Sequence, residues 1–135
     1  MAYKGKYSLK NIKKYVGNPR DITYRSLWER RFMVYCDTNP SVLKWASEEI
    51  VIPYLHPEGK KRRYYPDFYA EIKTDRGIKE YIIEIKPKKQ VGPPKKKNLY
   101  ESKTWAINKA KWEAARLYCG QRNWEFLILT EDHIL

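Results

Sequence analysis

Two short runs rich in tyrosine, isoleucine and phenylalanine, residues 65–69 and 82–86, lie on either side of the turn sequence Thr74-Asp75-Arg76-Gly77. Aromatic and β-branched residues favour strands, and a polar turn between two such runs predicts an antiparallel β-hairpin. A two-residue loop in this turn sets the register so that Asp67 lies directly opposite Glu84. This hairpin constrains the fold more than any other part of the chain.

The register decides whether the two acids meet. Side chains alternate between the faces of a strand, so directly opposed residues share a face with their Cβ atoms about 5 Å apart. Asp67 and Glu84 would then be close enough to hold one divalent cation, and Lys86 would point to the same face as Glu84. A three-residue loop would turn Asp67 to the other face, so the site requires an even loop or a bulge. The alternative is two exposed acids paired with lysines, but opposed carboxylates repel unless a cation lies between them.

The charge of the chain indicates the kind of partner. Its 135 residues suit one domain, and 28 Lys and Arg against 16 Asp and Glu give a net charge of +12, which favours a polyanion such as DNA. No long apolar run predicts a membrane span or a signal peptide, so we expect a soluble, intracellular protein without a membrane partner. The two cysteines have no CxxC spacing and are expected to be buried thiols.

Two basic runs continue directly from the hairpin strands. The first precedes the strand that carries Asp67. The second follows Lys86 in a segment broken by Pro87, Pro93 and Pro94, which we interpret as a mobile, DNA-contacting flap without regular structure. Solvated surface charge is the alternative for both runs. The residues predicted to contact DNA are Lys60, Lys61, Arg62, Arg63, Lys88, Lys89, Lys95, Lys96 and Lys97.

The remaining elements follow from periodicity and turn residues. Residues 1–22 are polar, basic and weakly periodic, and we interpret them as an N-terminal arm that leaves residues 23–135 as the folded domain. We predict a helix ending near Thr38 and capped by Asp21 or Thr23, a strand over 45–54, a helix over 102–119 stopped by Gly120, and a buried parallel strand over 124–130. The buried stripe of the first helix is expected to contain Tyr24, Leu27, Trp28, Phe32 and Tyr35.

The predicted order is helix, three antiparallel strands, helix, strand, which is an α/β fold with a mixed four-stranded sheet flanked by helices. An acid lies in the second strand and Glu-x-Lys in the third. This arrangement resembles the αβββαβ core of the PD-(D/E)XK nucleases and implies their restriction-endonuclease-like fold. The motif here is Pro66-Asp67 followed by Glu84-Ile85-Lys86.

Nearly the whole chain also resembles the head-completion nucleases of contractile-tailed bacteriophages. The segments that carry the resemblance are Thr23-Tyr24-Arg25-Ser26 with Trp28-Glu29, Ile52-Pro53-Tyr54, Glu58-Gly59-Lys60-Lys61-Arg62-Arg63-Tyr64, Ile83-Glu84-Ile85-Lys86-Pro87-Lys88-Lys89 and Ile128-Leu129-Thr130-Glu131-Asp132. The resemblance implies a nuclease that acts on packaged DNA before heads join tails. The implied location is the host cytoplasm during phage assembly or the virion, with head, portal or neck proteins as candidate partners.

The predicted chemistry is metal-dependent hydrolysis of phosphodiester bonds with little sequence specificity. Hard oxygen ligands from Asp67, Glu84 and the backbone carbonyl of Ile85 suit Mg²⁺, with Mn²⁺ as a substitute. Lys86 would orient or deprotonate the attacking water and offset the developing charge. The resemblance implies that Glu29 completes the site, whereas its spacing alone indicates a solvated helix charge.

Other functions remain open on the sequence. A non-enzymatic DNA-binding or head-tail adaptor protein would use the same cations and would bind DNA without cutting it. An RNA-binding module is less favoured, because most aromatics fall at core spacing and no RNP-type motif is present. The chain contains no GxxxxGK[ST] or GxGxxG loop, and its two histidines give little support for a histidine-based nuclease. Both endonucleolytic and exonucleolytic cleavage are compatible with the site.

Overall fold

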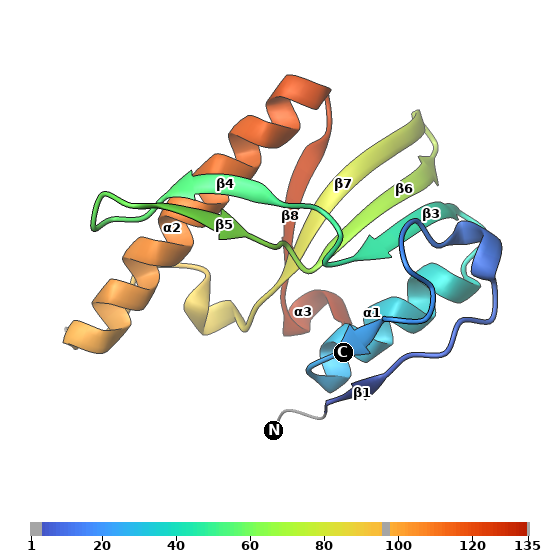
Figure 1. Cartoon of the computed structure of the whole chain (residues 1–135), viewed down its shortest axis with the longest axis horizontal. Coiled ribbons are helices and arrows are strands. Elements are labelled where there is room, and N and C mark those ends of the chain that lie inside the picture. Colours follow the sequence, from blue (N-terminus) through green and yellow to red (C-terminus); the bar gives the residue numbers. More distant parts are fainter. Residues whose placement is uncertain (1–3, 96–97, 135) are drawn as a thin grey trace.

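The computed structural model describes residues 4–95 and 98–134. Its central sheet has four strands in the order β3 (Val42–Ser47), β6 (Phe68–Thr74), β7 (Gly77–Ile85) and β8 (Glu125–Leu129). β3 and β7 each run antiparallel to β6, and β8 runs parallel to β7 (Figure 1). The mixed four-stranded sheet of the predicted α/β fold is therefore confirmed.

Two two-stranded sheets and three helices surround this central sheet. β1 (Gly5–Lys6) pairs with β2 (Thr23–Tyr24), and β4 (Ile52–Leu55) pairs with β5 (Lys61–Tyr64). The helices are α1 (Leu27–Thr38), α2 (Leu99–Arg122) and α3 (Glu131–Ile134), with 3-10 turns η1 (Ile12–Lys14) and η2 (Lys88–Gln90).

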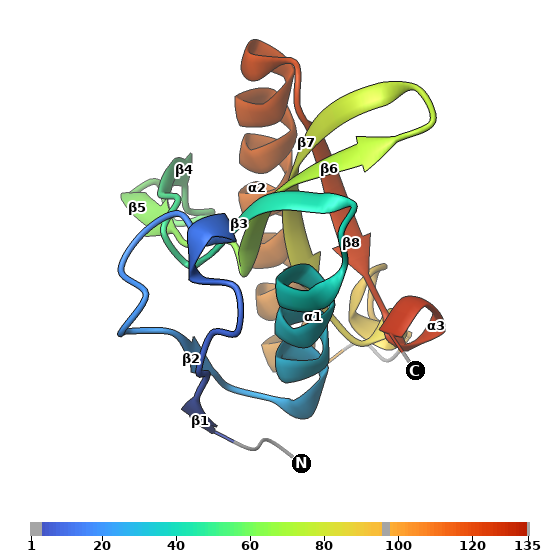
Figure 2. The same cartoon turned by 90° about the vertical axis from the view of Figure 1, so that its right-hand side faces the viewer.

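Alternation along β7 divides the interior into two hydrophobic cores. Tyr81, Ile83 and Ile85 face the first core, which contains α1 and the N-terminal segment, and Ile82 faces the second, which contains α2 and the β4–β5 hairpin. Figure 1 shows this hairpin lying across α2, and Figure 2 shows β1 and β2 beside α1. Because side chains alternate along a strand, Glu84 lies on the same face as Ile82, toward α2.

The predicted register of the β6–β7 hairpin is confirmed. Thr74 pairs with Gly77 across a two-residue turn, and the ladder continues to the pair of Phe68 and Ile83. Gly77 closes the turn at a φ of 102°, which residues with a side chain rarely adopt. Asp67, which directly precedes Phe68, is thereby placed beside the end of β7.

α1 begins later than predicted, and its cap is Ser26. The Ser26 hydroxyl accepts a 3.1 Å hydrogen bond from the backbone amide of Glu29, as an N-cap residue should. Thr23, one of the two predicted caps, lies in β2 and is held in extended backbone by its pairing with β1. Asp21, the other, forms an exposed ion pair with Lys6.

The buried face of α1 is rotated relative to the predicted stripe. Phe32 is buried and Trp28 packs against the first core, but Leu27 and Tyr35 are 44% and 41% exposed. The sheet covers one side of α1 and the N-terminal segment covers another, so residues on two sides of the helix are buried. The buried residues of the helix are Phe32, Met33, Cys36 and Asp37.

The N-terminal segment packs as part of the same fold. Tyr7 and Ile22 are buried in the first core. The fully buried Asp37 carboxylate accepts three hydrogen bonds of 2.8 to 2.9 Å from this segment, from the Tyr7 hydroxyl and from the backbone amides of Lys10 and Asn11. The boundary predicted at residue 22 does not coincide with a break in packing.

The single strand predicted over residues 45–54 is wrong. Glu48 has a φ of 55°, so the chain turns there and residues 42–55 form two strands in different sheets, β3 and β4. β4 then pairs with β5, which contains most of the first basic run, so this run is itself a strand and not only the approach to β6.

The second half of the chain follows the prediction with three corrections. α2 passes through Gly120, the predicted stop, and ends at Asn123, which has a left-handed φ of 61°. β8 lies at an edge of the sheet, so Glu125 and Leu127 are exposed where a buried strand was expected. The flap predicted to lack regular structure contains η2.

Two further predictions concern membranes and thiols. Of the helices formed by residues 4–95 and 98–134, none has the length and apolar character needed to cross a membrane. Cys36 and Cys119 are buried free thiols, one in each core, as predicted.

Candidate active site

Asp67 and Glu84 meet where β6 begins and β7 ends. Asp67 Oδ2 accepts a 2.8 Å hydrogen bond from the backbone amide of Ile85, which holds the aspartate against the Glu84-Ile85 pair. Glu84 is only 7% exposed. Burial raises the pKa of Asp67 well above its usual range, and the nearby Glu84 carboxylate raises it further. The buried Glu84 and the half-buried Asp67 therefore form a pair of neighbouring acids.

Two side chains compensate part of this charge. The Tyr64 hydroxyl donates a 2.7 Å hydrogen bond to Glu84 Oε1, and Lys86 Nζ lies 3.9 Å from Glu84 Oε2. Burial raises the pKa of Glu84, while the bond from Tyr64 and the charge of Lys86 oppose that rise. The predicted grouping of Asp67, Glu84 and Lys86 is thus present, and Tyr64 adds a donor to it.

The acid pair suits a hard divalent cation. Its ligands are carboxylate oxygens, and Asp67 Oδ1 accepts no hydrogen bond from any residue in 4–95 or 98–134. Within those residues no three His, Cys, Asp or Glu side chains gather closely enough to enclose a metal ion. Mg²⁺ is commonly bound through one or two carboxylates with several waters retained, so this pair supplies an appropriate donor set.

Glu29 lies near the pair without joining it. It is on the first turn of α1, and its carboxylate accepts a 3.2 Å hydrogen bond from the backbone amide of Arg25. Burial raises the pKa of Glu29, and the charges of Glu48 and Glu84 raise it further, whereas the bond from Arg25 opposes the rise. Glu29 is therefore within electrostatic reach of Glu84, and the prediction that it is merely a solvated helix charge does not describe it.

Glu48 and Glu49 occupy different positions from those a continuous strand would give them. Glu48 forms an ion pair with the Arg25 guanidinium, and Glu49 accepts a hydrogen bond from the Asn18 amide and packs against Gly17. Because both carboxylates have partners outside the acid pair, the structure assigns neither to it.

The predicted DNA-contacting residues fall into two groups. Lys60, Lys61, Arg62 and Arg63 are all exposed on the β4–β5 hairpin, directly before Tyr64. In the second basic run Lys89 and Lys95 are exposed, but Lys88 forms an ion pair of 3.0 Å with Asp132. Lys96 and Lys97 lie outside the described residues. The β4–β5 hairpin thus carries four exposed cations just before Tyr64 and Asp67.

Sequence reasoning missed two residues of this site, Tyr64 and Lys111. Lys111, on α2, lies with its Nζ 5.7 Å from the ring centroid of Tyr64 and 5.9 Å from that of Tyr54. Burial lowers the pKa of Lys111, and the Glu84 carboxylate opposes that change. Tyr64 could have been suspected from its place shortly before Asp67, but nothing in the sequence separates Lys111 from the other lysines of its helix.

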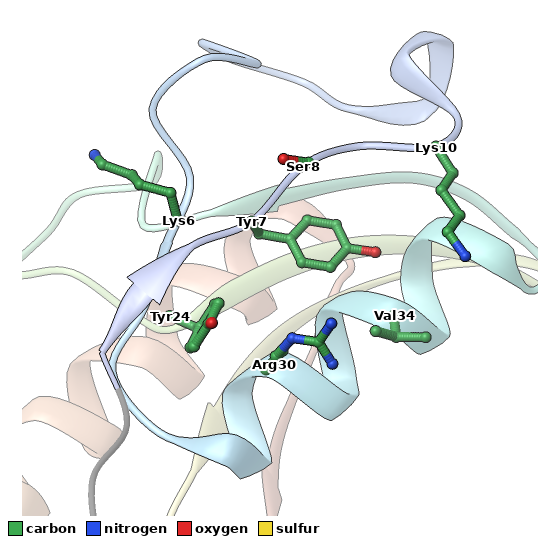
Figure 3. A pocket seen from close by; sticks show the side chains of 7 residues that line it. All are labelled: Lys6, Tyr7, Ser8, Lys10, Tyr24, Arg30 and Val34. Carbon is green, nitrogen blue, oxygen red and sulfur yellow. The ribbon is translucent and has the colours of Figure 1, made fainter.

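A hollow of about 230 Å³ lies elsewhere, between the N-terminal segment and α1. Figure 3 shows the Arg30 guanidinium and the Lys10 ammonium on its walls, with the Lys6 side chain turned away. The Tyr7 hydroxyl in this hollow is the one that bonds Asp37. None of the predicted catalytic residues lines the hollow, so it is a feature of how the N-terminal segment docks.

The fold agrees with what comparison with known proteins finds. Residues 39–131 match the sequence model of the family described as TnsA-like endonuclease N terminal, and the chain belongs to this family of nucleases with a restriction-endonuclease-like fold. The resemblance to the PD-(D/E)XK nucleases is thereby confirmed. Among individual proteins, the chain is similar to the head completion nuclease of Enterobacteria phage T4, with 46% identity over 143 residues that span 98% of this chain and 93% of the relative.

Proposed function

We propose that the chain is a divalent-metal-dependent deoxyribonuclease of low sequence specificity. The observation that carries the proposal is the pairing of the buried Glu84 with the half-buried Asp67, with Lys86 beside them. Two like charges in a buried position are unfavourable for folding alone, and such arrangements are concentrated at functional sites. Membership of an endonuclease family supports the same conclusion.

Asp67, Glu84 and the backbone carbonyl of Ile85 are the groups that would hold the cation. A bound Mg²⁺ or Mn²⁺ supplies charge neutralisation and lowers the pKa of water. The protein's own side chains supply orientation. Tyr64 fixes one oxygen of Glu84 through its 2.7 Å bond, and the Ile85 amide fixes one oxygen of Asp67 at 2.8 Å.

In this proposal, Lys86 and Glu29 act on the attacking water, and Lys86 also contacts the phosphate. The Lys86 ammonium can donate a hydrogen bond to a phosphate oxygen, and its neutral form can accept a proton from the water at Nζ. Glu29, whose pKa is affected by the charge of Glu84, would orient water through its carboxylate. Charge neutralisation matters because attack adds negative charge to a phosphodiester that is already an anion.

DNA as the substrate is supported by the net charge of the chain and by the position of its exposed cations. The net charge of +12 favours a polyanion, and exposed cations of the β4–β5 hairpin lie one residue from Tyr64. These groups can contact phosphates, which position a duplex without reading its sequence. We therefore expect cleavage with little sequence preference, by an endonucleolytic route and, where ends are present, an exonucleolytic one.

The biological setting is proposed from the relative. The T4 protein is named a head completion nuclease, and the identity of 46% extends over nearly both chains. We infer that this chain also takes part in completing a phage head before the tail joins, in the host cytoplasm or in the virion. Head, portal or neck proteins would be its partners.

The test is a plasmid-nicking assay. Supercoiled DNA is incubated with the wild type, Asp67→Asn and Lys86→Ala, in Mg²⁺, in Mn²⁺ and in a chelator. We expect metal-dependent nicking by the wild type and a loss of about 10²-fold or more in each variant. Equal nicking by all three proteins would refute the assigned site, and salt-sensitive DNA binding without any cleavage would favour the adaptor function.

A further inference from the structure

Lys111 stands at the boundary between the second core and the acid pair. The residue that follows it, Trp112, is 2% exposed and packs in the core with Tyr54 and Tyr64. Lys111 itself is half-buried, with its ammonium over the two tyrosine rings. Its aliphatic stem is therefore desolvated, whereas its charged end is carried along the aromatic surface to the active-site face of the sheet.

Tyr64 connects this lysine to the catalytic acids. Its ring contacts the Lys111 ammonium at 5.7 Å, and its hydroxyl binds Glu84 at 2.7 Å. Lys86 approaches the other oxygen of Glu84 at 3.9 Å. Two lysines from different elements, the end of β7 and the middle of α2, therefore flank one carboxylate.

The ammonium of Lys111 has no carboxylate of its own. Within residues 4–95 and 98–134 it forms no ion pair of 4.0 Å or less and no hydrogen bond. The aromatic rings attract the cation, but its three N–H donors remain without acceptors among these residues. A half-buried cation of this kind, beside a site for phosphate chemistry, is suited to receive an anionic oxygen.

We propose that Lys111 contacts the phosphate that is being cleaved and acts as a second catalytic cation opposite Lys86. The inference rests on the proposed nuclease function and adds a residue to that same site. With Glu29 counted, three carboxylates, one lysine and one divalent cation leave no net charge at the site. Lys111 makes the site cationic, which suits a phosphodiester whose negative charge grows from one to two when hydroxide attacks.

The role predicts a specific pattern among variants. Lys111→Gln removes the charge while keeping most of the stem, and Lys111→Arg keeps the charge. Lys109→Gln is the matched control, because Lys109 is exposed on the same helix and loses the same charge. We expect kcat/KM on plasmid DNA to fall about 10²-fold in Lys111→Gln, to recover in part in Lys111→Arg, and to stay near wild type in Lys109→Gln.

Binding provides a readout that a purely structural role would not move. Affinity for a short duplex is measured against salt concentration in the Asp67→Asn background without divalent metal. Loss of one phosphate contact should reduce the slope of log Kd against log salt by about 0.9 in Lys111→Gln. An unchanged slope together with a lowered melting temperature would show that Lys111 only packs on the tyrosines and would overturn the proposal.

The two possible failures can be told apart. If the wild type cuts DNA and Lys111→Gln cuts equally well, the role of Lys111 is refuted and the nuclease function stands. If the wild type cuts no DNA in any divalent metal, the proposed function and the catalytic role both fail.

Discussion

Replacing Asp67 by asparagine should make the metal-free protein more stable while it removes catalysis. The half-buried Asp67 carboxylate faces Glu84, and both its partial burial and that neighbour disfavour its charged form. The amide of Asp67→Asn keeps nearly the same shape and still offers an oxygen to the Ile85 amide, which now donates to Asp67 Oδ2 at 2.8 Å. The variant therefore removes the repulsion and keeps the hydrogen bond.

The size of the effect follows from the cost of a poorly compensated buried charge. We expect the free energy of unfolding at pH 8 to rise by about 1 to 3 kcal/mol, the usual cost of leaving a buried polar or charged group unsatisfied. Unfolding entropy is about 2.1 cal/mol/K per residue, so for a chain of 135 residues each kcal/mol raises the melting temperature by about 3.5 °C. The variant should melt roughly 4 to 10 °C above the wild type.

The pH dependence of the free energy of unfolding gives a second test of whether Asp67→Asn stabilises the metal-free protein. The pKa of Asp67 is raised on folding, so the folded state binds its proton more tightly than the unfolded state, where the value is near 3.8. Stability of the wild type must then decrease as the pH rises from about 3.8 through the raised folded pKa. The advantage of Asp67→Asn should accordingly be large at pH 8 and nearly absent at pH 4, where Asp67 is protonated in the folded wild type.

Thermal unfolding followed by circular dichroism, with chelator and with Mg²⁺, measures the melting temperatures of both proteins at pH 4 and pH 8. Mg²⁺ at 100 times its Kd should stabilise the wild type by about 2.7 kcal/mol and should leave Asp67→Asn almost unchanged. A lower melting temperature for the metal-free variant at pH 8 would refute the view that the acid pair is an unfavourable arrangement kept for its ligand.

Two further substitutions test the surroundings of the site and of the N-terminal segment. Tyr64→Phe removes the 2.7 Å bond to Glu84 and should lower the free energy of unfolding by about 1 kcal/mol and nicking about tenfold; unchanged nicking would show that Glu84 needs no such donor. Asp37→Ala leaves the Tyr7 hydroxyl and two backbone amides without their acceptor, so urea denaturation should show a loss of about 3 kcal/mol or more, whereas the exposed control Asp21→Ala should change the urea midpoint little. Equal losses in these two variants would contradict the anchoring role of Asp37.

The sequence is informative about the hairpin because the necessary signals are local. A two-residue turn and the alternation of side chains along β6 and β7 are enough to bring Asp67 and Glu84 together, and the register confirms it. The roles of these residues in catalysis stay predictions. The boundary errors are also local: Ser26 and Asn123 set the ends of α1 and α2, in competition with other plausible caps nearby.

The missed features depend on contacts between distant residues. The break between β3 and β4 occurs at Glu48, whose left-handed backbone is unusual for a residue other than glycine and leaves no mark in the sequence. The rotation of α1 depends on Asp37, whose partners lie in the N-terminal segment. Lys111 becomes distinctive only when α2 has packed against the β4–β5 hairpin and Tyr64 has reached Glu84.

The division of the interior into two cores provides a built-in pair of probes for partial unfolding. The chain has two cysteines, and each core contains one of them, Cys36 on α1 and Cys119 on α2, both at most 1% exposed. A buried thiol reacts with an alkylating reagent only when its surroundings open, so mass spectrometry of the two labelled peptides reports each core separately. The native protein can thus reveal, without any substitution, whether the two sides of the sheet open independently. One is the side covered by α2, where the acid pair lies, and the other is the side covered by α1 and the N-terminal segment.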